Sequence, residues 1–143
     1  MKESISESFN RIQWHDSKLR SLRVLRRDAM DEVILDVELR GASEQELTPM
    51  AVVLEDAIFL FSDLDLQGKR ECADDISSAK CDTKTDFMTK LQFKRLNNSP
   101  AALAGYFHFS VYLIPPGGTV DIIASGFRLE GPDREALHPF SNR

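Results

Sequence analysis

Four consecutive residues near the start of the chain, Trp14-His15-Asp16-Ser17, carry side chains that could do chemistry. An imidazole beside a carboxylate could act as a base oriented by the acid, or as a metal ligand. Neighbouring residues of an extended chain point to opposite faces, however, so His15 and Asp16 do not easily serve one site. A structural interpretation is therefore preferred, in which Trp14 covers the core and Asp16 or Ser17 bonds backbone groups where the first strand begins.

A second histidine, His108, lies in the middle of a strand expected over residues 106–114, with Tyr106 and Ser110 on the same face. A half-buried, hydrogen-bonded histidine is its expected role. If His15 and His108 met in space, their rings would become the polar groups of a ligand pocket or a metal site. The candidate ligand-binding residues of this alternative are Trp14, His15, Asp16 and His108.

The other polar motifs indicate turns and solvated faces, not catalysis. Asp63 and Asp65 share a face if they lie on a strand, but the further oxygen ligands of a calcium-binding loop are absent. Pro115-Pro116-Gly117-Gly118 is followed by a strand and lacks the lysine of a phosphate-binding loop, so it predicts a hairpin turn. We identify no catalytic residue, metal ligand set or cofactor motif, and an enzyme is the less favoured interpretation.

The composition is that of an ordinary globular protein. The chain has 143 residues, of which 42% are hydrophobic and 29% charged, and its formal net charge is −5. This length fits one domain that buries a core without disulfides or metal ions. The negative net charge argues against sequence-independent binding to nucleic acid. Cys72 and Cys81 lack the spacing of a zinc site and are expected to be free thiols in a reducing compartment.

The two ends of the chain are expected to lie outside the folded domain. Residues 1–11 are polar and rich in serine and glutamate, which predicts a loosely ordered arm. Residues 132–143 are expected to form an exposed tail, which leaves a single domain over residues 12–131. The arm lacks the apolar segment of a signal peptide, and no apolar run approaches the ~18 residues that span a bilayer. We therefore expect a cytoplasmic protein with no membrane partner.

Alternating apolar residues predict an antiparallel hairpin in the first third of the chain. The run 18–25 is typical of a strand with a bulge near Ser21, because Leu19 and Leu22 are out of phase. The run 32–39 has the clearest period-two pattern in the sequence. Because a short polar turn joins these two runs, they are expected to pair with each other.

The middle of the chain allows more than one interpretation. A third strand is expected over residues 50–54, and the apolar run 57–61 fits either a buried strand or a buried helical turn. The polar stretch 71–85 predicts a loop with one helical turn. Residues 86–93 fit either a strand or a helix capped by Thr85, and the helix is preferred.

The last third predicts a second hairpin, which completes the fold. Residues 106–114 carry aromatic or β-branched side chains on both faces, and residues 120–129 are expected to return as one strand. The fold class is therefore a single α+β domain, mostly β, built on an antiparallel sheet of about five to seven strands with one or two short helices. The expected core comprises Trp14, Leu22, Val24, Val33, Leu35, Val37, Val52, Leu54, Phe59, Phe107, Phe109, Val111, Leu113, Ile122 and Phe127.

Two segments resemble a group of small bacterial proteins that open with a W-H-D-S-x-L motif. The first is Trp14-His15-Asp16-Ser17-Lys18-Leu19, and the second comprises residues 105–109 and 116–124, with a His-Phe pair, a Gly-Gly turn and an apolar strand. In that group the last strand continues as Ala-Arg-Asp-Phe, where this chain has Ala124-Ser125-Gly126-Phe127. The resemblance implies a small α+β or mostly β domain of uncharacterised function, immunity-like in some cases. No catalytic residue is carried over.

Two hypotheses of function follow from the sequence. The favoured one is a non-enzymatic protein-interaction or regulatory domain, an immunity-like binder, because no catalytic set is found and a sheet offers a face or an edge to a partner. Its acidic surface, which would meet a basic partner, is expected to comprise Asp63, Asp65, Asp74 and Asp75. An uncovered edge strand would also allow a homodimer. The alternative is a small-ligand or metal-binding domain that uses His15 and His108.

Overall fold

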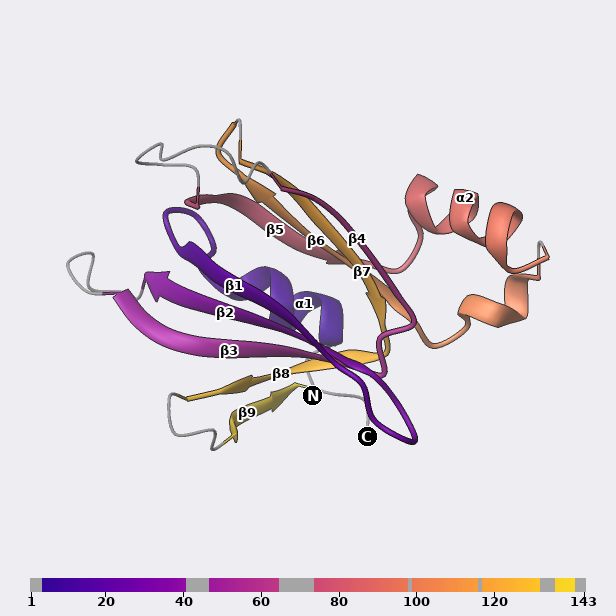
Figure 1. The fold of residues 1–143 in the computed structure, drawn as a ribbon, viewed down its shortest axis with the longest axis horizontal. Helices are drawn as coiled ribbons and strands as arrows, with labels where there is room; N and C mark the ends of the chain where they lie inside the picture. Colours follow the sequence, from indigo (N-terminus) through magenta and orange to yellow (C-terminus); the bar gives the residue numbers. More distant parts are fainter. Residues whose placement is uncertain are drawn as a thin grey trace.

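The computed structural model describes residues 4–40, 47–64, 74–97, 99–115, 117–131 and 136–140. Within them the chain forms a mostly β, α+β domain, which confirms the expected fold class (Figure 1). The strands are divided between two antiparallel sheets, where a single sheet is expected from the sequence. Sheet A has five strands in the order β1-β2-β3-β8-β9, and sheet B has four in the order β4-β7-β6-β5.

The bounds of the elements are as follows. Sheet A contains β1 (Lys18–Leu25), β2 (Glu32–Arg40), β3 (Leu47–Glu55), β8 (Gly126–Glu130) and β9 (Ala136–Phe140). Sheet B contains β4 (Phe59–Leu64), β7 (Gly118–Ala124), β6 (Phe107–Leu113) and β5 (Ile76–Asp82). The helices are α1 (Ile5–Arg11), α2 (Asp86–Arg95) and the short 3-10 helix η1 (Pro100–Leu103).

Several local predictions are confirmed. Strands β1 and β2 pair antiparallel, and their register shifts between Leu19 and Ser21, where the bulge is expected. The run 57–61, which fits either a strand or a helical turn, is not helical, and its residues 59–61 lie in strand β4. Residues 86–93 lie in helix α2, and the Thr85 side chain accepts a hydrogen bond from the backbone N–H of Met88 as its N-cap.

Two stretches of strand differ from the prediction. The loop expected over residues 71–85 contains β5, which pairs with β6 along the edge of sheet B. Its buried apolar residues, Ile76 and Cys81, are five positions apart and a register shift follows Ile76, so no period-two pattern is visible. The single strand expected over residues 120–129 is two strands, because the chain passes from sheet B to sheet A at Ser125. The backbone N–H of Ser125 donates to the carbonyl oxygen of Glu55 at 2.9 Å.

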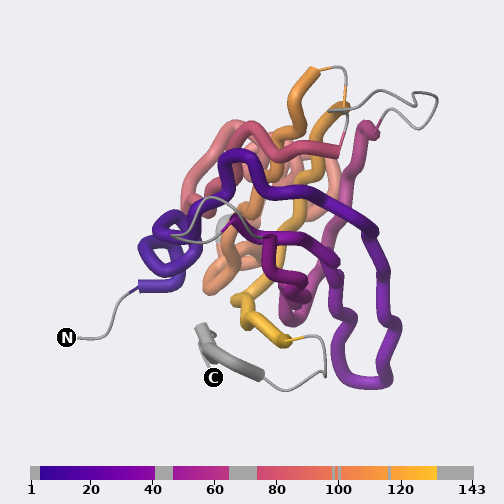
Figure 2. Tube along the Cα trace, turned by 90° about the vertical axis from the view of Figure 1, so that its left-hand side faces the viewer, coloured from indigo at the N-terminus to yellow at the C-terminus, as the bar shows by residue number. Residues whose placement is uncertain are grey.

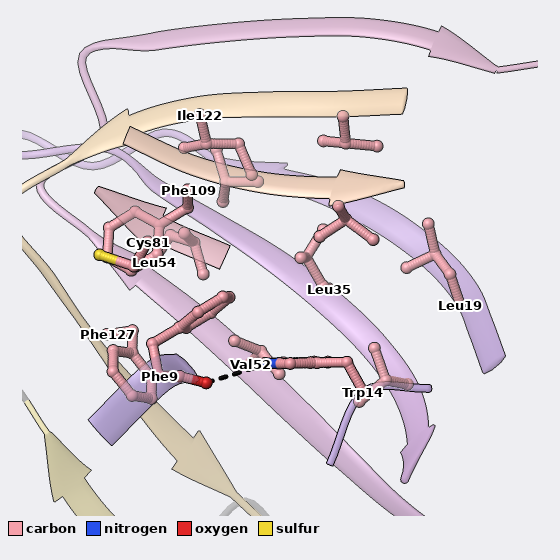
Figure 3. Close-up of a cluster of buried hydrophobic side chains, with 14 of the residues drawn as sticks. Phe9, Trp14, Leu19, Leu35, Val52, Leu54, Cys81, Phe109, Ile122 and Phe127 are labelled. Atoms are coloured by element: carbon pink, nitrogen blue, oxygen red, sulfur yellow. Dashed lines mark hydrogen bonds between the residues drawn. The ribbon is translucent and has the colours of Figure 1, made fainter. Parts of the chain in front are cut away.

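The main core lies between the two sheets and includes residues of α1 (Figure 3). Most residues of the expected core are buried there, from Trp14 to Phe127. Leu22, Phe59 and Phe107 are only partly buried. The prediction that Val24 belongs to the core is wrong, because its side chain is 49% exposed. Val24 lies on the edge strand of sheet A, near the end of a hairpin that projects past sheet B (Figure 1).

The polar arm expected over residues 1–11 contains helix α1, which begins after Ser4. The Ser4 hydroxyl accepts a hydrogen bond from the backbone N–H of Glu7, and Phe9 is completely buried. The indole Nε1 of Trp14 donates to the carbonyl oxygen of Phe9 at 2.9 Å. Figure 2 shows α1 at one side of the two sheets. Two apolar side chains, Ile5 and Phe9, therefore dock an otherwise polar segment in the core.

The prediction of an exposed C-terminal tail is wrong for residues 136–140, which form β9 and pair with β8 in sheet A. The rest of that tail, residues 132–135 and 141–143, lies outside the described residues. Among the helices that the structure describes, none is long and apolar enough to cross a membrane.

The thiol of Cys81 is expected to be chemically inert in the folded protein. Burial raises the pKa of Cys81 to about 12, although a hydrogen bond with the Ser6 hydroxyl lowers it slightly. At pH 8 only about one thiol in ten thousand is then ionised, and the thiolate is the reactive form. Iodoacetamide at pH 8 should leave Cys81 unmodified in native protein and alkylate it in guanidinium chloride. Peptide mass mapping checks this, and rapid alkylation of the native protein would contradict it.

Candidate functional site

The first candidate cluster, around His15, is an exposed loop between α1 and β1. The His15 side chain is 70% exposed, and its Nδ1 lies 3.2 Å from the carbonyl oxygen of Ser77. Its Nε2 is 3.6 Å from Oδ1 of Asp16, which is also largely exposed. Trp14 is buried in the core, and the Ser17 hydroxyl donates to the carbonyl oxygen of Gln13. The structural interpretation of Trp14 and Ser17 is therefore confirmed.

The second candidate, His108, lies far from His15. His108 is opposite Asp82 in the register of β6 and β5, whereas His15 contacts Ser77 near the other end of β5. Five residues of strand separate these points by about 17 Å. The structure therefore does not bring His15 and His108 into one pocket. Among the residues that the structure describes, no three His, Cys, Asp or Glu side chains gather as potential metal ligands.

The His108 ring is buried on the face of sheet B that turns away from the main core. It stacks on the ring of Phe87, with 4.6 Å between the centroids. Its Nε2 is 2.7 Å from Oδ1 of Asp121, and its Nδ1 is 2.8 Å from Oγ1 of Thr85. The Ser110 hydroxyl donates to the same Asp121 oxygen. Strands β6 and β7 of sheet B and the start of α2 thus share a hydrogen-bond network. We call it the His108 network, and its members are Thr85, His108, Ser110 and Asp121.

The donors and acceptors of this network are matched. An ionised carboxylate only accepts hydrogen bonds, so His108 carries its proton on Nε2 and donates to Asp121. In the neutral tautomer with its proton on Nε2, Nδ1 accepts from the Thr85 hydroxyl, whose oxygen in turn accepts from the backbone N–H of Met88. A neutral His108 therefore satisfies every member of this chain, as a buried polar network requires.

The consequence of the network is that α2 is fixed to sheet B. Met88 and Leu91 of the helix pack in a small cluster with Leu103 and Ile123. The Phe87 ring meets the Phe59 ring edge-on, with 6.1 Å between the centroids. Since a ten-residue helix is marginal in isolation, α2 depends on these contacts for its conformation and its orientation.

Removing the Thr85 hydroxyl should weaken this attachment. Thr85→Ala deletes the N-cap and leaves Nδ1 of His108 without its donor. A lost cap typically costs about 1 kcal/mol and an unsatisfied buried group about 1–3 kcal/mol, so we expect a loss of about 2–4 kcal/mol. Urea unfolding measures this. Thr85→Ser is the matched control, because it keeps the hydroxyl and should change stability by less than about 0.5 kcal/mol. Equal losses in both variants would contradict this role of the hydroxyl.

A cavity of about 460 Å³ lies between α2 and η1. Its polar lining includes Thr85, Thr89 and Gln92, while Met88 and Phe107 contribute apolar surface. Thr85 is the one member of the His108 network among the residues that line it, and Lys84 is the one charged residue. A cavity of this size suits a small ligand. Because the described residues of its lining include no carboxylate, histidine or cysteine, the cavity defines no reaction.

The outward face of α2 carries a different arrangement. Phe93 follows the buried Leu91 by two residues, which places it on the opposite side of the helix, and it is 70% exposed. Lys90 and Lys94 lie three residues before and one residue after Phe93, and both are exposed. We call Lys90, Phe93 and Lys94 the α2 face. In Figure 1 the helix lies at one extremity of the molecule, at the end of sheet B.

The cations of α2 differ from the others that the structure describes. Elsewhere, most cations have a carboxylate partner: Lys18 with Asp75, Arg20 with Asp74 and Glu38, Arg23 with Asp36, Arg26 with Asp31, Arg27 with Glu32, Lys80 with Asp82, and Arg128 with three glutamates. Lys84, Lys90, Lys94 and Arg95 form no ion pair within the described part of the chain. Uncompensated positive charge is therefore concentrated at this helix.

The expected acidic surface is altered by the same ion pairs. Lys18 and Arg20 neutralise Asp75 and Asp74, so these two carboxylates are not available to a basic partner as expected. Asp63 is exposed on the edge strand β4, and Asp65 lies outside the described residues. Two of the four expected acidic residues, Asp74 and Asp75, thus form ion pairs with cations of the same chain.

Sequence reasoning missed two parts of this region. Asp121 lies opposite Ser110 in the β6–β7 register, and only that pairing brings its carboxylate to the His108 ring. The α2 face was also missed, although a helical projection of residues 86–95 separates Phe93 from Met88 and Leu91. That separation was the signal that could have revealed it.

Together, the fold and this region define a two-sheet, mostly β domain with a basic helix held against one sheet by a buried histidine network. No protein-family model, no curated protein and no solved structure matches this chain. Its function is therefore argued from the geometry of its own residues.

Proposed function

We propose that this protein is a non-enzymatic interaction domain that binds a partner protein through the α2 face. The observation that carries the proposal is an exposed phenylalanine beside two lysines that have no ion-pair partner among the described residues. Aromatic side chains are enriched in the centre of protein interfaces, whereas charged residues lie at the rim. The α2 face has this composition, with the aromatic Phe93 next to the charged pair Lys90 and Lys94.

The His108 network supports the proposal because it gives the helix a fixed orientation before a partner arrives. Binding through a rigid element requires less ordering of the chain, which leaves more of the contact energy for affinity. The stack of Phe87 on the buried His108 ring and the Thr85 cap both hold the first turn of α2. The resemblance to W-H-D-S-x-L proteins would make the partner a toxin and the role immunity-like, and the experiment below does not depend on it.

Differential capture tests the proposal. The full chain, Phe93→Ala and Phe61→Ala are immobilised and exposed to the same lysate of the source organism. Phe61 is the matched control, because it is also an exposed phenylalanine, 51% accessible, but lies on β4. A protein retained by the wild type and by Phe61→Ala, but not by Phe93→Ala, is then purified.

The dissociation constants of that purified protein with the wild type, Phe93→Ala and Phe61→Ala are then compared. Truncating a central aromatic residue of an interface commonly weakens binding by about tenfold or more. We therefore expect this loss for Phe93→Ala and less than about threefold change for Phe61→Ala. Equal affinities for Phe93→Ala and wild type would contradict the proposal, as would a loss that is confined to Phe61→Ala.

A further inference from the structure

We infer that the partner surface bound by the α2 face is acidic and contains an apolar pocket that receives Phe93. This inference rests on the proposed function and adds the chemistry of the partner. Its carrying observation is the charge distribution of the molecule together with the ion pairs that neutralise most of the other cations of the described chain.

The charge of the α2 segment is opposite to that of the rest of the chain. Residues 84–95 contain four cations and one carboxylate, a formal charge of +3, whereas the whole chain is at −5, which leaves −8 elsewhere. The one carboxylate is Asp86 in the first turn, where it faces the positive end of the helix dipole. Lys94 and Arg95 lie in the last turn, where the dipole is negative, so positive charge is favoured locally.

An acidic protein surface fits this arrangement better than nucleic acid does. Nucleic acid presents a continuous line of phosphates. The formal charge of −8 outside residues 84–95 would repel those phosphates over most of the protein surface. A protein partner needs only a local acidic patch, which the two lysines would meet while the rest of the molecule stays apart. Phe93 lies beside those lysines and favours an apolar contact, which a phosphate backbone does not supply.

Site-specific photo-cross-linking tests the inference in the complete protein. The photoreactive residue p-benzoylphenylalanine replaces Phe93 in one variant and Phe61 in a control, and both are irradiated in cells of the source organism. Mass spectrometry then identifies the segment attached to each position. We expect position 93 to attach to a protein segment rich in Asp and Glu with apolar residues between them.

A second readout measures the charge dependence of the complex. Lys90→Glu combined with Lys94→Glu should weaken binding of the cross-linked partner at least about tenfold, and raising the ionic strength from about 0.05 to 0.5 M should weaken the wild-type complex several-fold. The control is Lys80→Glu, at another exposed lysine, on β5, which should change the affinity by less than about threefold.

The possible failures are distinguishable. If position 93 attaches to a neutral or basic segment, to nucleic acid, or to a second copy of this chain, the acidic-partner inference is overturned. A complex that is insensitive to salt and to Lys90→Glu with Lys94→Glu overturns it as well. If position 61 cross-links and position 93 does not, the α2 face is not the binding surface, and the proposed function itself fails.

Discussion

Arg128→Met is expected to lower the free energy of unfolding by about 3–5 kcal/mol, as removal of one partner from a buried ion pair commonly does. Arg128 lies on β8 and its guanidinium bonds three buried glutamates. Nη1 is 3.1 Å from Glu32 and 2.8 Å from Glu55, and Nε is 2.8 Å from Glu130. Methionine would fill the space, but it would leave these carboxylates close together without their common cation.

The charges of this cluster are strongly coupled. Burial alone lowers the pKa of Arg128, but its hydrogen bonds to Glu32, Glu130 and Glu55 outweigh burial and raise that pKa above the ordinary value. The guanidinium therefore stays charged throughout the range in which the protein is handled. Since the fork of nitrogens reaches several carboxylates at once, a lysine cannot reproduce these contacts.

Urea unfolding of two further variants separates charge from geometry. Arg128→Lys keeps the positive charge and should lose less stability than Arg128→Met. Adding Glu55→Gln to Arg128→Met removes one of the uncompensated charges and should recover part of the loss. If Arg128→Met unfolds at the wild-type urea concentration, the cluster contributes nothing, and the ion pairs have no stabilising role.

Phe9→Ala is expected to have an effect of similar size, a loss of about 3–5 kcal/mol. The Phe9 ring is completely buried and lies between three other rings. Its centroid is 4.7 Å from that of Trp14, 5.0 Å from that of Phe109 and 5.1 Å from that of Phe127 (Figure 3). Alanine would leave a cavity at the point where α1 meets both sheets.

Because α1 has only seven residues, it should not persist without that contact. Hydrogen–deuterium exchange of Phe9→Ala is therefore expected to show faster exchange in α1 than in β6. The control is Phe93→Ala, the same substitution at an exposed position, which should change stability by less than about 0.5 kcal/mol. An equally small loss in Phe9→Ala would show that α1 does not close the core.

The sequence allowed the local elements to be predicted where one physical signal dominates. Alternation predicted β1, β2 and β6, and the N-cap at Thr85 predicted α2. β5 was missed because its register shift disrupts the alternation. Helix α1 was missed because seven mostly polar residues give little sign that one of them, Phe9, fills the core.

The candidate site was predicted less completely, because its geometry depends on pairing between distant segments. His108 was expected to be hydrogen-bonded, and it is, but its partners come from the start of α2 and from β7. The proximity of His15 and His108 was left open, and their positions along β5 separate them. The unpaired lysines of α2 could be recognised only after the ion pairs of the other cations were known.

Hydrogen–deuterium exchange of the full chain with and without its captured partner tests the central claim, that α2 presents the binding surface, most directly. The account predicts that the partner slows exchange in the segment 84–95, while the tip of the β1–β2 hairpin and strand β4 are unchanged. Slower exchange at β4 or at that hairpin, with the rates of 84–95 unaltered, would contradict the claim and place the binding surface elsewhere.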